Sequence, residues 1–216
     1  MEDVLEVYQR PYTSHFPVVC VDEAGKELQS HLEGREPCPA QPGQEGGSSP
    51  RQDYTYQRNG SASLLMMSEP LCGWRKVTVH SDRSGQTFAR ELQKLVDEDY
   101  PTAEKIVLVT DNLNIHGIWS LYEVFPPSEA RRIVDKLEWH YTPEHGSWLN
   151  MAEIEISAMS RQCLGRRFGD EDSLRMEVEA WVKERNQRTV KIRWQFTAAD
   201  ARIRLRRLYP VLEDKT

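Results

Sequence analysis

Two short segments, FPVVCV at residues 16–21 and IVLV at residues 106–109, are apolar almost throughout and are closely followed by an aspartate. A strand that is apolar on both faces is typical of the centre of a sheet covered by helices. Asp22 and Asp111 are therefore expected at or just beyond the ends of two such strands. The Ala-Gly pair after Asp22 favours a turn residue there, and a metal ligand is the alternative.

The stretch from Leu137 to Leu164 predicts a strand, a turn and a helix. Apolar and polar residues alternate through 137–142, which is typical of a half-buried strand. Pro143 and Gly146 end that pattern, and Ser147 is expected to cap the following helix. Steps of three and four residues predict a core-facing stripe on this helix, formed by Leu149, Ala152, Ile156, Met159 and Cys163.

Two glutamates of this helix have different expected positions. Glu153 lies at the edge of the apolar stripe, where its charge requires compensation by solvent, a salt bridge or a metal ion. Glu155 is about 200° further around the helix and is expected on the opposite flank. Glu153 is therefore the residue expected to face the sheet.

The remaining pattern predicts an α/β domain with a mixed five-stranded sheet flanked by helices. Two more strands are expected at 64–67 and 77–80, and helices at 4–8, 85–100, 118–125, 128–134, 174–185 and 198–208. The chain divides into a lead-in helix (1–15), a central domain (16–165) and a basic helical extension (166–216). Repeated Pro, Gly and Ser make residues 33–53 a flexible loop.

Composition limits the class of protein. Charged residues make up 29% and hydrophobic residues 38% of the chain, which is typical of a soluble globular protein. No apolar run approaches the ~20 residues needed to cross a bilayer, and the acidic N-terminus is unlike a signal peptide. The four cysteines are widely separated, which argues against a zinc site or a disulfide framework. The cytoplasm is the expected location.

The net charge of −6 argues weakly against nucleic-acid binding, but the basic residues are unevenly distributed. After Ser160 they form three groups, and each group is either a solvated helix face or part of a phosphate-binding surface. The groups are Arg161, Arg166 and Arg167; Arg185, Arg188, Lys191 and Arg193; and Arg202, Arg204, Arg206 and Arg207.

Asp22, Asp111 and Glu153 are expected to converge, because sites in open sheets form beyond the strand ends. Three carboxylates without basic partners would repel one another unless divalent cations neutralised them. Two hard cations held by such carboxylates can activate a nucleophilic oxygen and stabilise a leaving oxygen in phosphoryl transfer. A nuclease or strand-transfer site is the chemistry that this set predicts.

Several motifs resemble the catalytic part of bacterial transposases of the insertion sequence 630 family, within the mariner-like DDE superfamily. The resemblance spans about residues 1–210, and the motifs occur in the same order: VVCVDEA, RNGSASLLMMSEPLCGW, KIVLVTDNLNIH, EWHYTPEHGSWLNMAEIE and SRQCLGRR. The family normally also carries an N-terminal helix-turn-helix region that reads the transposon ends. This chain starts just before the catalytic part, which raises the expectation of a truncated form.

The resemblance implies an RNase H-like fold and a catalytic, metal-binding triad of Asp22, Asp111 and Glu153 with Mg²⁺ or Mn²⁺, expected as two ions. It further implies cut-and-paste transposition in a bacterial cytoplasm on the nucleoid, with transposon-end and target DNA as partners, and it leaves a homodimer open. Membranes are not expected partners. Two rival functions remain: a catalytically idle DNA-binding or assembly module, and a hydrolase of RNA–DNA hybrids.

Further DNA contacts are less strongly indicated. Asn112 and His116 follow Asp111, where they can position DNA or simply form a structured loop. His145 precedes the Glu153 helix and can contact a phosphate, although capping or packing is the simpler explanation. The basic residues chosen as DNA-binding candidates are Arg161, Arg166, Arg167, Arg202 and Arg206.

Overall fold

The computed structural model describes residues 1–33, 38, 53–111 and 117–209, and its centre is one five-stranded sheet. The strand order is β3-β2-β1-β4-β5. β1 to β3 form an antiparallel meander, whereas β4 pairs in parallel with both β1 and β5. The predicted mixed sheet is thereby confirmed. The strands are β1 (Val18–Ser30), β2 (Gln57–Glu69), β3 (Trp74–His80), β4 (Ile106–Thr110) and β5 (Leu137–Tyr141).

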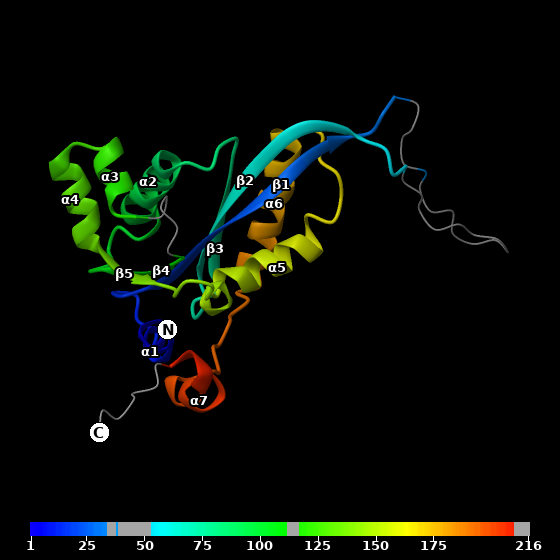
Figure 1. Ribbon diagram of the computed structural model, residues 1–216. Helices are drawn as coiled ribbons and strands as arrows, with labels where there is room; N and C mark the ends of the chain where they lie inside the picture. Colours follow the sequence, from blue (N-terminus) through cyan, green and yellow to red (C-terminus); the bar gives the residue numbers. More distant parts are fainter. Residues whose placement is uncertain (34–37, 39–52, 112–116, 210–216) are drawn as a thin grey trace, which may run out of the picture.

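Helices cover both faces of the sheet (Figure 1). One layer contains α2 (Gly85–Lys94), which continues as a π-helical turn (Leu95–Asp99), together with α3 (Trp119–Val124) and α4 (Pro127–Lys136). The other layer contains α5 (Ala152–Gln162) and α6 (Glu171–Gln187). Two short helices, α1 (Glu2–Gln9) and α7 (Ala198–Arg204), pack together at the lower edge in Figure 1. Every helix in the described ranges is too short or too polar to cross a bilayer.

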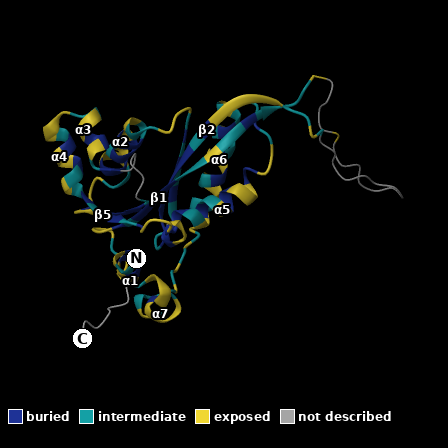
Figure 2. Ribbon diagram, in the orientation of Figure 1, coloured by how far each residue is buried: buried dark blue, intermediate teal, exposed yellow. Residues whose placement is uncertain are grey.

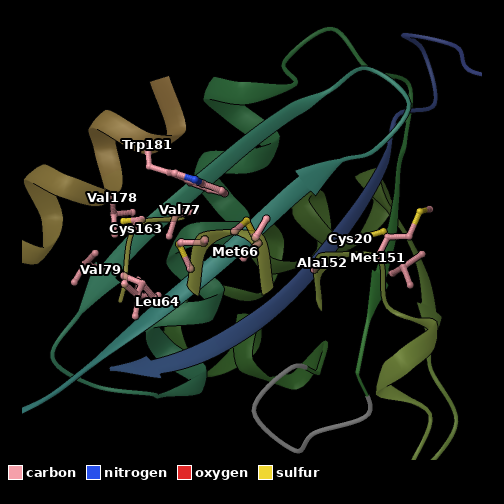
Figure 3. Packing of buried hydrophobic residues seen from close by; sticks show 14 of the residues in the cluster. Cys20, Leu64, Met66, Val77, Val79, Met151, Ala152, Cys163, Val178 and Trp181 are labelled. Atoms are coloured by element: carbon pink, nitrogen blue, oxygen red, sulfur yellow. The ribbon is translucent and has the colours of Figure 1, made fainter. Parts of the chain in front are cut away.

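The two faces of β1 belong to two separate hydrophobic cores. Val19 and Val21 pack with α2 to α4, whereas Cys20 packs with α1, α5 and α6. Figure 3 shows Cys20 beside Met151 and Ala152, and Figure 2 shows the central strands buried between the layers. Because successive side chains of a strand point to opposite faces, the face of each β1 residue follows from its parity. Asp22 therefore shares the α5 face with Cys20.

The turn between β2 and β3 depends on Gly73. Its φ of +79° is disfavoured for residues with a Cβ, and a Cβ placed there would lie 2.9 Å from the carbonyl carbon of Thr189. Glycine therefore permits both the tight turn and the close approach of the chain that follows α6. The sequence placed this turn correctly, near Cys72 and Gly73.

Several boundaries differ from those predicted. β1 extends to Ser30, well beyond the predicted end at Val21, because its second half, although mostly polar, continues to pair with β2. Ser147 does not cap α5: residues Ser147–Leu149 form a 3₁₀ turn, and the helix begins at Ala152. Thr197 does cap α7, in a capping box with Asp200. Most of the predicted 33–53 loop lies outside the described residues, and the domain boundaries after 15 and 165 stay predictions.

Candidate active site

Asp22 lies in β1, and Asp111 directly follows β4, the strand that pairs with β1 in parallel. The pairing ends at Cys20 and Val109, and a register continued by two residues would set Asp22 opposite Asp111. Val107 and Val109 pack in the same core as Cys20, so continued parity assigns Asp111 to the α5 face as well. Asp22 is buried and Asp111 is half-buried. β1 continues past Asp22 by pairing with β2, so Asp22 lies within the strand and not at its end. Only the first part of β1 pairs with β4.

Asn150 connects the start of α5 to Asp22. This fully buried residue donates from Nδ2 to the backbone oxygen of Val21 at 2.8 Å and to Oδ2 of Asp22 at 3.3 Å. Its Oδ1 accepts a hydrogen bond from the backbone N–H of Ala152, the first residue of α5. Asp22 also accepts from the backbone N–H of Glu23 through Oδ1. One amide side chain thus fixes both the helix start and the carboxylate.

Tyr8 supports the same junction from α1. Its hydroxyl donates to the backbone oxygen of Leu149 at 2.7 Å and accepts from the N–H of Met151 at 3.3 Å. Burial raises the pKa of this phenol well above 10, and it raises the pKa of the neighbouring Cys20 thiol to about 12. Both groups therefore remain protonated near neutrality, and Cys20 does not supply a thiolate beside Asp22.

Glu153 lies in the first turn of α5, three residues after Asn150. Its side chain is half-buried, and its backbone N–H donates to the Asn150 carbonyl oxygen at 3.1 Å. Through Asn150, the turn bearing Glu153 is attached to the strand that carries Asp22. The first turn of α5 thus lies on the face of the sheet that carries Asp22, and its convergence with Asp111 stays a prediction.

The predicted position of Glu155, on the flank of the helix opposite to the one that faces the sheet, is wrong. Glu155 is completely buried, whereas Ile156 of the expected stripe is only half-buried. The sheet-facing side of α5 therefore includes Ala152, Glu155 and Met159. The predicted angle between the two glutamates around the helix is correct. The core, however, lies on the side of the helix to which Glu155 points, and the prediction placed it on the other side.

Two arginines compensate the buried charge of Glu155. Its Oε2 lies 2.7 Å from Nε of Arg185 on α6 and 3.3 Å from Nε of Arg75 on β3. The Arg75 side chain is 1% exposed, and its other nitrogens donate to Asn186 and to the Val190 carbonyl oxygen. This cluster of Glu155, Arg75 and Arg185 joins the active-site helix to an edge strand and to α6.

The donors at the candidate site fit a divalent cation by their chemistry. Adjacent aspartates repel when both are ionised, and carboxylate oxygens are the preferred ligands of Mg²⁺ and Mn²⁺. Within the described part of the chain, however, no three His, Cys, Asp or Glu side chains form a group that could hold one ion. The approach of Asp22 to Asp111 and the three-carboxylate metal centre therefore stay predictions.

The predicted DNA-contacting residues have varied surroundings. Asn112 and His116 lie outside the described residues. His145 is not packed: its side chain is 93% exposed and its φ is +59°. Arg161 is exposed on α5 and donates to Ser157 Oγ at 2.5 Å. His145 and Arg161 are therefore accessible to a ligand.

Other predicted DNA contacts are engaged within the protein. Arg166 pairs with Glu177, and Arg202 pairs with Glu2 at 2.5 Å. Arg167 donates to the carbonyl oxygens of Asp53 and Thr55 and stacks on Tyr56, which braces the β1–β2 ribbon. Arg206 is exposed at the end of the described chain and, with Arg204 and Arg207, lines a hollow of about 690 Å³. The positions of these arginines in the sequence do not show which of them pair within the protein and which are free to contact a ligand.

Sequence reasoning did not single out Asn150, Tyr8, Arg75 or Arg185. A signal for Asn150 was present, because Asn-x-x-Glu ahead of an apolar run is a helix-start pattern. The partners of Glu155 left no such local signal, because Arg75 and Arg185 are 80 and 30 residues away along the chain.

A mixed five-stranded sheet in this order, with helices on both faces, is the architecture of an RNase H-like fold of the DDE type. The model of the DDE superfamily endonucleases matches residues 17–175. The chain belongs to this family. No curated protein matches it.

A solved structure described as the Mos1 strand transfer complex contains a similar fold. The likeness has a TM-score of 0.50 at 16% sequence identity and covers 87% of this chain and 54% of the other. The chain thus spans about half the length of that relative. At this identity the likeness concerns the fold, and the finer assignment to the insertion sequence 630 branch stays a prediction.

Proposed function

We propose that this chain cleaves DNA strands with the help of divalent metal ions and transfers the cut ends to target DNA, as in cut-and-paste transposition. One observation supports the proposal: Asn150 ties the first turn of the Glu153 helix to Asp22 in β1, and Asp111 directly follows β4, the parallel neighbour of β1. Membership of the DDE superfamily endonucleases and the fold of the Mos1 strand transfer complex support it.

Asp22, Asp111 and Glu153 are the residues that would hold Mg²⁺ or Mn²⁺. Such ions, when bound as a pair, stabilise the attacking and leaving oxygens of a phosphoryl transfer. Neighbouring residues of the chain hold the Asp22 carboxylate and the helix of Glu153 in position. Asn150 orients the Asp22 carboxylate and fixes the first turn of α5, while Tyr8 holds the residues on either side of Asn150. The low exposure of Asp22 limits the water that competes for its oxygens.

The test is metal-dependent nicking of a supercoiled plasmid. We expect relaxation of the plasmid in Mn²⁺ and none in excess EDTA, because the carboxylates need a bound cation to act on a phosphodiester. An RNA–DNA hybrid is assayed in parallel. No nicking of DNA in Mn²⁺ or Mg²⁺ would favour the idle binding module, and faster cleavage of the hybrid would favour the hybrid hydrolase.

Metal binding itself can be measured without catalysis. A cation at ten times its dissociation constant stabilises the folded protein by about 1.4 kcal/mol, or roughly 3–6 °C for a chain of this size. Asp111→Asn should lose most of this shift, relative to its own melting temperature in EDTA, because one of the clustered charges is removed. Asp135→Asn, on α4 across the sheet, is the matched control. A full shift in Asp111→Asn would exclude Asp111 as a ligand.

A further inference from the structure

The segment between α6 and α7 contains residues 190–196, which form neither helix nor strand (Figure 1). Two backbone groups fix it: Ile192 N–H donates to the Pro70 carbonyl oxygen at 2.9 Å, and the Val190 carbonyl oxygen accepts from Arg75 at 2.6 Å. Further along, the Trp194 ring lies 5.2 Å from that of Tyr8. This connecting segment is therefore held in place although it belongs to neither a helix nor a strand of the sheet.

Side chains of the connecting segment alternate in burial. Val190, Ile192, Trp194 and Phe196 are half-buried, whereas Lys191, Arg193 and Gln195 are exposed. In an extended backbone, successive side chains point to opposite sides, so every second side chain faces the solvent. Because the backbone is fixed, Lys191 and Arg193 are presented on one outward face.

Lys191 and Arg193 line a hollow of about 360 Å³ together with Tyr8, Arg10 and Tyr12. Arg10 is paired with Glu138 at 2.7 Å. Lys191 and Arg193 have no ion pair with any residue in the described ranges. The nearby carboxyl of Glu69 is 3% exposed beneath the surface and accepts a hydrogen bond from Tyr100. The hollow thus has two uncompensated cations beside the half-exposed ring of Tyr12.

The hollow adjoins the candidate active site through one residue. Tyr8 forms part of its wall, and the hydroxyl of the same side chain contacts Leu149 and Met151, on either side of the Asn150 that bonds to Asp22. Tyr8 itself is buried, so it connects the wall of the hollow with the backbone around Asn150 through the interior of the protein. Lysine and arginine are the usual partners of backbone phosphates, and an exposed aromatic ring can stack against a base or sugar.

We propose that Lys191 and Arg193, with Arg10 and Tyr12, form a second DNA-binding surface that holds backbone phosphates flanking the bond to be cut. The proposal rests on DNA being the substrate of the active site. The phosphate contacts are thereby assigned to residues other than the arginines chosen from the sequence. Of those arginines, Arg166, Arg167 and Arg202 already have partners within the protein.

The experiment measures binding of the full chain to a fluorescent DNA duplex of random sequence by anisotropy, in EDTA. Lys191→Ala/Arg193→Ala should bind at least about tenfold more weakly near 0.1 M salt. The slope of log affinity against log salt should become shallower by about 2, since two phosphate contacts are lost. The matched control, Arg90→Ala/Arg131→Ala, removes two exposed charges on α2 and α4, in the layer across the sheet, and should bind like the unmodified chain. Equal melting temperatures will establish that both variants are folded.

Equal binding by the unmodified chain and Lys191→Ala/Arg193→Ala would overturn the proposal, and so would equal weakening in the control. Failure of the unmodified chain to bind duplex DNA would overturn it too, whereas plasmid nicking would still decide the proposed function separately. Polyglutamate is the competing probe. Binding of polyglutamate but not of DNA, lost in the variant, would assign the surface to an acidic protein segment instead.

Discussion

Glu153→Gln is expected to reduce metal-dependent cleavage by at least about a thousandfold, the scale on which removal of one member of a catalytic set acts. Glutamine keeps the size of the side chain but removes the charge needed to bind a cation. Glu153 is half-buried in the first turn of α5, so the change should alter the free energy of unfolding by less than about 1 kcal/mol.

Plasmid nicking in Mn²⁺ measures the first quantity, and urea denaturation measures the second. Glu179→Gln is the control, because Glu179 is exposed on α6 and the substitution is chemically identical. Cleavage by Glu153→Gln within tenfold of the unmodified chain would contradict a role for this residue in the chemistry.

Glu155→Gln is expected to act mainly on stability, with a large decrease in the free energy of unfolding, whereas Glu153→Gln acts mainly on cleavage. The substitution leaves Arg75, whose side chain is 1% exposed, without its counter-charge, and breaking a buried ion pair from one side costs about 3–5 kcal/mol. For a chain of this size the melting temperature should fall by about 6–20 °C. The loss of cleavage should follow unfolding as temperature rises, whereas the defect of Glu153→Gln is present at every temperature.

A double substitution separates charge from packing. Glu155→Met/Arg75→Met removes both buried charges while keeping side-chain volume, so it should recover part of the lost stability. Thermal melts of the two variants and the unmodified chain are sufficient. A melting temperature for Glu155→Gln within 2 °C of the unmodified chain would mean that the ion cluster contributes little to stability.

The contrast between these glutamates illustrates what the sequence could and could not predict. Local patterns predicted the sheet, because the apolar runs 16–21 and 106–109 carry their own signature of burial. They also predict that Asp22 and Asp111 lie near each other, at or just beyond the ends of two buried strands. The burial of Glu155 depends instead on arginines from two distant elements, and no window of neighbouring residues contains that information.

His140 gives a second example. Alternation predicted β5 correctly but assigned the buried face to Leu137, Trp139 and Tyr141. Trp139 and Tyr141 are only half-buried, whereas His140 is 8% exposed and lies 2.7 Å from Asp3 of α1. A polar side chain can occupy a core position when a partner comes from elsewhere in the chain, and α1 supplies that partner here.

The pairing of α1 with α7 has a consequence for the order of the chain. Glu2 accepts hydrogen bonds from Arg202 and from the Tyr209 hydroxyl, the latter at 2.8 Å, so the first and last described helices meet. Chains whose ends lie together tolerate circular permutation, because a short linker can join them without rearranging the core. New ends opened within the exposed start of β2, at residues 57–61, would leave both hydrophobic cores continuous. The fold therefore depends on which elements are in contact, and less on the order in which loops connect them.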